Sequence, residues 1–153
     1  MNWNGKDVET YFKEKQFVDT AIIPLLPLRF DEGGMKQAAQ QGEFILLLST
    51  YLEKQFKGRL FLFPPFSYLE QEKEKGERLR RWEEQCKQQG FVHVFYLTSD
   101  PEWKTYEDLL QGTVLWVPSV PLEHVDRQFK HSLMDDQVKQ LIQLIVHKWQ
   151  HQP

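Results

Sequence analysis

The chain has 153 residues, of which 41% are hydrophobic and 27% are charged. This balance is typical of a globular protein and excludes a disordered chain, and the length lets one domain bury roughly 70% of its unfolded surface. The 19 basic and 22 acidic side chains are mixed along the chain and leave a net charge of −3. Because no positive field of domain size exists to bind phosphates, we expect one domain over residues 1–153 that does not bind nucleic acid.

The location of the protein is predicted from its cysteine content and its apolar segments. Cys86 is the only cysteine, and one unpaired thiol is typical of a reducing compartment. No basic stretch followed by an apolar run begins the sequence, and no segment approaches the roughly 18 apolar residues needed to cross a bilayer. The sequence therefore predicts a soluble, cytoplasmic protein that does not insert into a membrane.

The first predicted elements are a short helix and a buried strand. Apolar residues at helical spacing predict a helix from Asp7 to Gln16. The apolar run from Thr20 to Leu28 predicts a strand covered on both faces. Prolines within that run cannot donate ladder hydrogen bonds, so we expect the strand to end near Pro24. A polar loop from Arg29 to Gly34 follows.

The middle of the chain contains two predicted helices and one strand. A strong helical pattern ends at Phe56, and Leu60–Phe63 reads as a second strand that Pro64–Pro65 ends abruptly. A charged helix is predicted from Glu70 to Gln89, with a narrow apolar stripe. Charges that alternate in sign up to Arg81 are typical of a solvated face, and the alternative is a docking surface for a charged partner.

The last third of the chain contains two predicted strands and two helices. Phe91–Leu97 reads as the third strand, and Asp100 with Pro101 are suited to begin a helix as its N-cap and first residue. Thr113–Val117 reads as the fourth strand. A final amphipathic helix begins near Asp135 or Asp136, either of which is a suitable cap.

Four apolar strands separated by segments of helix length predict the fold class. This alternation is typical of an α/β three-layer sandwich with a mostly parallel sheet, flavodoxin-like or Rossmann-like, and we expect the strand order 2-1-3-4. In such sheets ligands bind beyond the carboxyl ends of the strands. The candidate ligand-binding residues in the loops expected there are Asp31, Glu32, Ser67, Tyr68, Ser99, Asp100, Trp103 and Ser119.

These candidates suit a small polar molecule such as a nucleoside or a sugar-like compound. Carboxylates of Asp31 and Asp100 would accept hydrogen bonds from sugar or amine groups, and rings of Tyr68 and Trp103 would stack on a base or sugar ring. The alternative is that they are ordinary helix-start and loop residues. The clustered rings of Phe61–Phe66 are open to two similar interpretations, packing or a stacking platform for a planar ligand.

Signatures of catalysis, metals and cofactors are absent from the sequence. Neither dinucleotide-binding nor phosphate-loop glycine patterns occur, and no hydrolase nucleophile elbow is present. His147 and His151 have the i, i+4 spacing of metal ligands, but their place in the last turns favours a solvated face. We therefore expect no metal and no cofactor, and the sequence does not decide whether the protein is an enzyme.

The absence of such signatures favours a non-catalytic interaction or regulatory domain. The charged helix is the surface predicted to bind a protein partner, through Arg78, Arg80 and Arg81. The alternative is a small-molecule enzyme or sensor that acts at the strand ends.

The whole chain also resembles the YpiF-like family of uncharacterised proteins from spore-forming Gram-positive bacteria. The resemblance rests on Trp3 with Asp7-Val8, on the segment from Phe17 to Pro27, and on the segment from Phe61 to Tyr68. It implies a cytoplasmic domain of unknown function with no assigned catalytic residues. Members encoded beside a respiratory quinol to cytochrome c reductase further imply a regulatory or assembly partner, by gene association alone.

Overall fold

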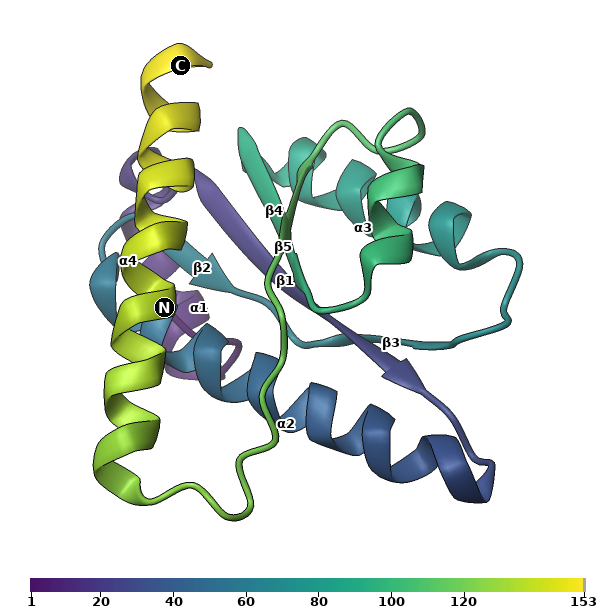
Figure 1. Ribbon diagram of the computed structural model, residues 1–153. Coiled ribbons are helices and arrows are strands. Elements are labelled where there is room, and N and C mark those ends of the chain that lie inside the picture. The colour runs from purple at the N-terminus through teal and green to yellow at the C-terminus, as the bar shows by residue number, and fades with distance from the viewer. Residues whose placement is uncertain (153) are drawn as a thin grey trace.

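A computed structural model describes residues 1–152 and shows a parallel sheet between two layers of helices (Figure 1). The strands are β1 (Thr20–Leu28), β2 (Leu60–Leu62), β3 (Phe66–Leu69), β4 (His93–Thr98) and β5 (Thr113–Trp116). The helices are α1 (Gly5–Lys13), α2 (Glu32–Gln55), α3 (Lys75–Gln89) and α4 (Arg127–His151), with 3-10 turns η1 (Lys15–Phe17) and η2 (Pro101–Tyr106). The fold is the predicted three-layer α/β sandwich.

The strand order also agrees with the expectation. The sheet runs β2-β1-β4-β5, with β3 as a second partner of β1, and every pairing is parallel. The four strands predicted from the sequence therefore stand in the order 2-1-3-4. Because parallel strands point the same way, their carboxyl ends lie along one edge of the sheet.

Side chains of β1 are buried on both faces, which explains its unbroken apolar run. Ile22 packs in a core with residues of α2 and α4, whereas Ala21, Ile23 and Leu25 pack in a second core with residues of α1, α3 and η2. Figure 1 shows the same division, with α2 and α4 on one side of the sheet and α3 on the other.

The prediction that β1 ends near Pro24 is wrong, because the strand continues through both prolines to Leu28. Hydrogen bonds made by Thr20 and Ile22 show that even-numbered residues of β1 turn their backbone groups toward β2. The missing N–H of Pro24 therefore faces the gap between β2 and β3. Pro27 faces the opposite side, beyond the last paired residue of β4. Neither proline removes a ladder hydrogen bond.

The segment after Pro64–Pro65, predicted as a loop, is instead the strand β3. Ile22 pairs with Leu62 and Leu25 pairs with Phe66, so three residues stand opposite two at the two prolines. This extra residue is a bulge, the position in a sheet edge that tolerates proline. The chain resumes pairing with β1 after it, which brings the next residues into the sheet.

Several helix boundaries also differ from the prediction. The helix α2 begins at Glu32, so the glycines expected in the preceding loop lie in its first turn. The helix α4 begins at Arg127 and is capped by Asp126, whose side chain accepts from the Phe129 amide at 2.8 Å. Local capping by an Asp brings the start forward by more than two turns. Gly90 ends α3 with a φ of 120°, a backbone conformation that favours glycine.

Among the residues that the structure describes, no helix is long and apolar enough to cross a membrane.

Candidate functional site

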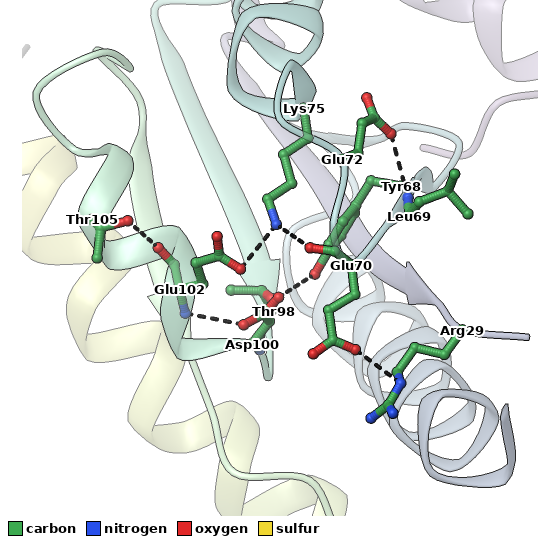
Figure 2. A network of polar contacts seen from close by, with 10 residues as sticks. All are labelled: Arg29, Tyr68, Leu69, Glu70, Glu72, Lys75, Thr98, Asp100, Glu102 and Thr105. Atoms are coloured by element: carbon green, nitrogen blue, oxygen red, sulfur yellow. Dashed lines mark hydrogen bonds and ion pairs between the residues drawn. The ribbon is translucent and has the colours of Figure 1, made fainter. Parts of the chain in front are cut away.

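The carboxyl ends of β1 and β4 form the switch point of the sheet. The crossover after β1 leads to β2 on one side, and the connection after β4 leads to β5 on the other. Ligands of open parallel sheets bind at such points. Figure 2 shows polar side chains from three separate segments meeting there, with Tyr68, Lys75 and Asp100 turned toward one another.

Tyr68 and Asp100 are brought together although 32 residues separate them. The Tyr68 hydroxyl donates to the Asp100 carboxylate at 2.7 Å, and the ring meets the Trp103 indole edge-on with centroids 5.0 Å apart. Burial, followed by the hydrogen bond to Asp100, raises the pKa of Tyr68 well above its usual value. Because the phenol stays protonated at neutral pH, it serves here as a hydrogen-bond donor and not as a base.

Lys75 is the buried cation of this network, with only 1% of its surface exposed. Its ammonium donates to the Glu70 carbonyl at 2.8 Å and to the Glu102 carboxylate at 2.9 Å (Figure 2). The same nitrogen lies 5.2 Å from the Tyr68 ring centroid. A buried ammonium needs such partners. Through these contacts Lys75 connects the start of α3 to η2 across the sheet edge.

Arg29 directly follows β1 and bridges two acidic side chains. Its guanidinium donates to both Asp31 oxygens, at 3.2 and 2.9 Å, and lies 3.1 Å from the Glu70 carboxylate. The hydrogen bonds from Arg29 hold the pKa of the Asp31 carboxyl below its usual value. A Cβ at Gly34 would lie 2.1 Å from the Arg29 Nε, so glycine leaves room for this guanidinium.

A cavity of about 680 Å³ lies between the ends of β1 and β3. Its lining runs from Leu28 to Asp31 and from Leu69 to Glu72. The charged residues of this lining are largely paired within the chain, since Arg29 holds two carboxylates and Glu72 accepts two hydrogen bonds from Arg78. Each ionised side chain of the cavity wall therefore already has a partner within the chain.

The remaining predicted ligand residues lie apart from this network. Ser67 is on β3, where its carbonyl accepts from Arg78 at 3.0 Å, and the Ser99 carbonyl accepts from the Trp116 indole at 3.1 Å. Glu32 is exposed on the first turn of α2, and Ser119 is exposed in the loop after β5. The structure thus brings together Tyr68, Asp100 and Trp103, with Asp31 joined to the same sheet edge through Arg29 and Glu70. Ser99 is buried, and Glu32 and Ser119 are exposed away from the network.

A second region, which we call the aromatic groove, lies on the sheet face covered by α1 and α3. It has a volume of about 620 Å³. One wall is formed by Val8, Tyr11 and Phe12 of α1, at the i, i+3 and i+4 positions of a helix face. The other wall is the face of α3 that carries Trp82 and Cys86.

Aromatic rings make up the floor and one lip of the groove. Phe61, Phe63 and Phe91 lie at its base and contact one another edge-on or tilted, with centroids 5.3 to 6.1 Å apart. Trp3 packs against the first two of these rings, yet 59% of its surface is exposed, as is 59% of Phe12. Large exposed rings beside an apolar hollow are the usual mark of an interaction site.

Only one of the three arginines predicted to bind a partner lines the groove. Arg78 donates to Glu72 and Ser67, and Arg80 lies within ion-pair distance of two neighbouring glutamates of α3. Arg81 lines the groove, and among residues 1–152 no carboxylate lies within ion-pair distance of it. Its charge is therefore available at the rim.

Cys86 lies on the groove wall as a packing residue. It is buried, and desolvation raises the pKa of its thiol to about 11, with a further contribution from the nearby Glu83 carboxylate. A thiol with this pKa carries almost no thiolate at neutral pH. The groove therefore contains no reactive nucleophile of this kind.

Two buried charges of α3 were missed by the prediction of a solvated helix. Lys75 and Glu83 are 1% and 3% exposed, and Glu83 accepts from the backbone amides of Gln111 and Gly112 at 2.9 and 2.7 Å as well as from Tyr96. A signal existed, because Lys75 and Glu83 stand four residues before and after Leu79 on the apolar stripe.

No group of three or more His, Cys, Asp or Glu residues within residues 1–152 is placed to hold a metal ion. His147 and His151, the pair with metal-ligand spacing, stack on each other with centroids 4.1 Å apart, and the His151 Nδ1 lies 2.8 Å from the His147 carbonyl.

Comparison with known proteins identifies relatives of the chain but no activity. A family model described as "Protein of unknown function (DUF2487)" matches residues 9–149. The uncharacterised protein YpiF of Bacillus subtilis (strain 168) is 36% identical over 149 residues, which cover 97% of this chain and 98% of that protein. No solved structure matches the chain significantly. These matches confirm the resemblance stated from the sequence.

Proposed function

The chain belongs to the DUF2487 family of proteins of unknown function, and we propose that it is a non-catalytic interaction domain that binds a protein partner in the aromatic groove. The observation that carries this proposal is the exposure of Trp3 and Phe12 beside an apolar hollow of about 620 Å³. Apolar patches of this kind on a folded domain are favoured at binding sites because partner contact removes them from water.

The proposed docking surface lies on the same helix as the predicted one but uses different side chains. The sequence pointed to the three arginines of α3, whereas the side chains that face the groove are Arg81 and the apolar stripe with Trp82. Arg78 and Arg80 form ion pairs with carboxylates of this chain. A cytoplasmic location and one functional domain over residues 1–153 belong to this proposal, supported by the single unpaired thiol of Cys86.

Affinity purification of the tagged full chain from cells, followed by mass spectrometry, tests the proposal. We expect a partner that is retained by the wild type and lost with Phe12→Asp, and that binds again when the two purified proteins are mixed. Phe129→Asp is the matched control, because Phe129 is 57% exposed and lies on α4, away from the groove. Equal recovery of every protein with Phe12→Asp and Phe129→Asp would contradict the proposal.

A second candidate function is a binding protein or enzyme for a nucleoside or sugar-like molecule at the strand ends. The cavity of about 680 Å³ beside Arg29 and Asp31 supports it, because its size suits a small ligand. The internal pairing of Tyr68 with Asp100 counts against it. Thermal-shift screening with nucleosides and sugars tests this candidate, and a stabilising hit that Asp31→Asn abolishes would favour it.

A further inference from the structure

We propose that the occupant of the aromatic groove is an amphipathic α-helix of the partner, with an acidic residue placed against Arg81. This inference rests on the proposed function and deepens it by naming the chemistry of the partner segment. Three features of the groove lead to it: the hydrogen-bonding capacity of its lining, its length, and its charge.

The lining offers almost nothing to an extended backbone. Most of the side chains that surround the groove are apolar, and the outer edge of β2 is already paired with Met1 and Asn2. The Leu62 amide donates to the Met1 carbonyl at 2.8 Å, and the Met1 nitrogen donates to the Leu60 carbonyl at 2.9 Å. An extended segment buried here would leave its peptide groups unsatisfied, whereas a helix satisfies its own.

The length of the groove suits a short helical segment. Its longer wall runs from Arg81 to Gln89 of α3 and is therefore about 12 Å long at a rise of 1.5 Å per residue. At one end the Gln89 side chain donates to the Tyr11 hydroxyl at 3.3 Å and joins the two walls. A helix of two to three turns has about this length and would present anchors at i, i+3 or i+4, and i+7.

The charge of the groove selects an acidic helix. Arg81 is the only ionised side chain at neutral pH among the residues that line it. Within residues 1–152 no carboxylate is placed to pair with its guanidinium. An Asp or Glu at the end of the bound helix near Arg81 would form a charge-assisted hydrogen bond, and a basic residue there would be repelled.

Selection from two displayed peptide libraries tests this inference on the full chain. Both libraries hold peptides of about 14 residues, one with apolar residues at helical spacing and the other with apolar residues at alternate positions. We expect enrichment only from the helical library, with Asp or Glu recurring near one end. The best peptide should bind wild type and Arg127→Glu alike and Arg81→Glu at least about tenfold more weakly.

Charge exchange makes the test specific. Replacement of the acidic peptide residue by Lys should weaken binding to the wild type and restore binding to Arg81→Glu. Both Arg81 and Arg127 are exposed, so the variants should keep the circular dichroism spectrum of the folded chain. Enrichment from the alternating library, or equal binding to wild type and Arg81→Glu, would overturn the inference.

The outcome also separates this inference from the function on which it rests. If a cellular partner depends on Phe12 while no helical peptide binds, the inference is overturned and the docking function stands. If dodecanoate, an apolar carboxylate with no helix, binds in the groove and quenches tryptophan fluorescence while no peptide is enriched, the inference is again overturned. If Phe12→Asp still binds the partner and the peptide as well as the wild type does, both the docking function and the helix inference are overturned.

Discussion

The strand ends and the aromatic groove differ in whether their side chains are free to contact a ligand. At the strand ends Lys75, Tyr68 and Arg29 each find an acidic or carbonyl partner within the chain. In the groove Trp3 and Phe12 remain more than half exposed. At the position that parallel sheets generally use for ligands, the polar side chains are paired within the chain, whereas the exposed rings of Trp3 and Phe12 lie beside a groove with an almost entirely apolar lining. The topology of a sheet therefore nominates a site, but the pairing of its side chains decides whether the site is free.

If the strand-end network is structural, the largest loss should follow removal of its buried cation. Lys75→Ala should lower the free energy of unfolding by about 3 kcal/mol, because it breaks two hydrogen bonds and leaves a void beside Tyr68. Lys75→Met, which keeps the volume, should cost less. Denaturant unfolding measures both, with exposed Lys73→Ala as the control. A change below about 0.5 kcal/mol for Lys75→Ala would show that the network is not structural.

Arg78 should behave as part of the sheet edge and not as a free surface charge. Arg78→Ala should lower the free energy of unfolding by about 1 kcal/mol, because its guanidinium satisfies the Ser67 carbonyl and pairs with Glu72. Arg80→Ala, which removes only exposed ion pairs, should change stability by less than about 0.5 kcal/mol. Equal effects of the two substitutions in denaturant unfolding would remove this distinction.

The groove should show the opposite combination, a small effect on stability with a large effect on binding. Phe12→Ser should lower the free energy of unfolding by less than about 1 kcal/mol, since the ring is already 59% exposed. Partner retention should nevertheless be lost. Thermal denaturation and affinity purification on the same preparation measure the two quantities. Strong destabilisation by Phe12→Ser would mean that Phe12 has a structural role.

The smallest expected effect concerns pH and His93, which lies at the start of β4, at the edge of the sheet opposite the strand ends. Desolvation lowers the pKa of this buried imidazole below 6.5, with nearby Asp19 opposing the shift and Arg59 adding to it. Below pH 6.5 the unfolded chain therefore binds a proton that the folded chain resists, and stability falls as the pH falls through this range.

His93→Gln should accordingly lose less stability than the wild type between pH 7 and pH 5. Denaturant unfolding at the two pH values gives the difference for each protein, and other titrating groups cancel in the comparison. An equal loss in both proteins would show that His93 does not contribute to acid sensitivity.

Elements dominated by local patterns were predictable from the sequence. The apolar runs at Leu60–Phe63, Phe91–Leu97 and Thr113–Val117 each coincide with a strand of the sheet to within two residues, and the alternation of strands with helices indicated the order 2-1-3-4. Right-handed crossovers leave few other arrangements. Asp100 also begins a helical turn as expected, although the turn is 3-10.

Features that depend on neighbours in space were not predictable in this way. The effect of Pro24 depended on which side of β1 its missing amide faces, and β3 exists because a bulge at Pro64–Pro65 restores pairing. Lys75 is buried although its segment alternates in charge, because Glu70 and Glu102 satisfy its ammonium. The free-energy cost of a proline in a strand or of a buried charge depends on which hydrogen-bonding partners surround it.

The layers, the parallel sheet and the two apolar stripes, one on α1 and one on α3, follow from periodicity, which is a property of each segment alone. That these stripes face each other across Phe61 and Phe63 and leave a groove between them depends on tertiary packing. So does the pairing of the acidic residues at the strand ends within the chain. Both outcomes depend on contacts between segments far apart in sequence, and no local pattern records which side chains will meet.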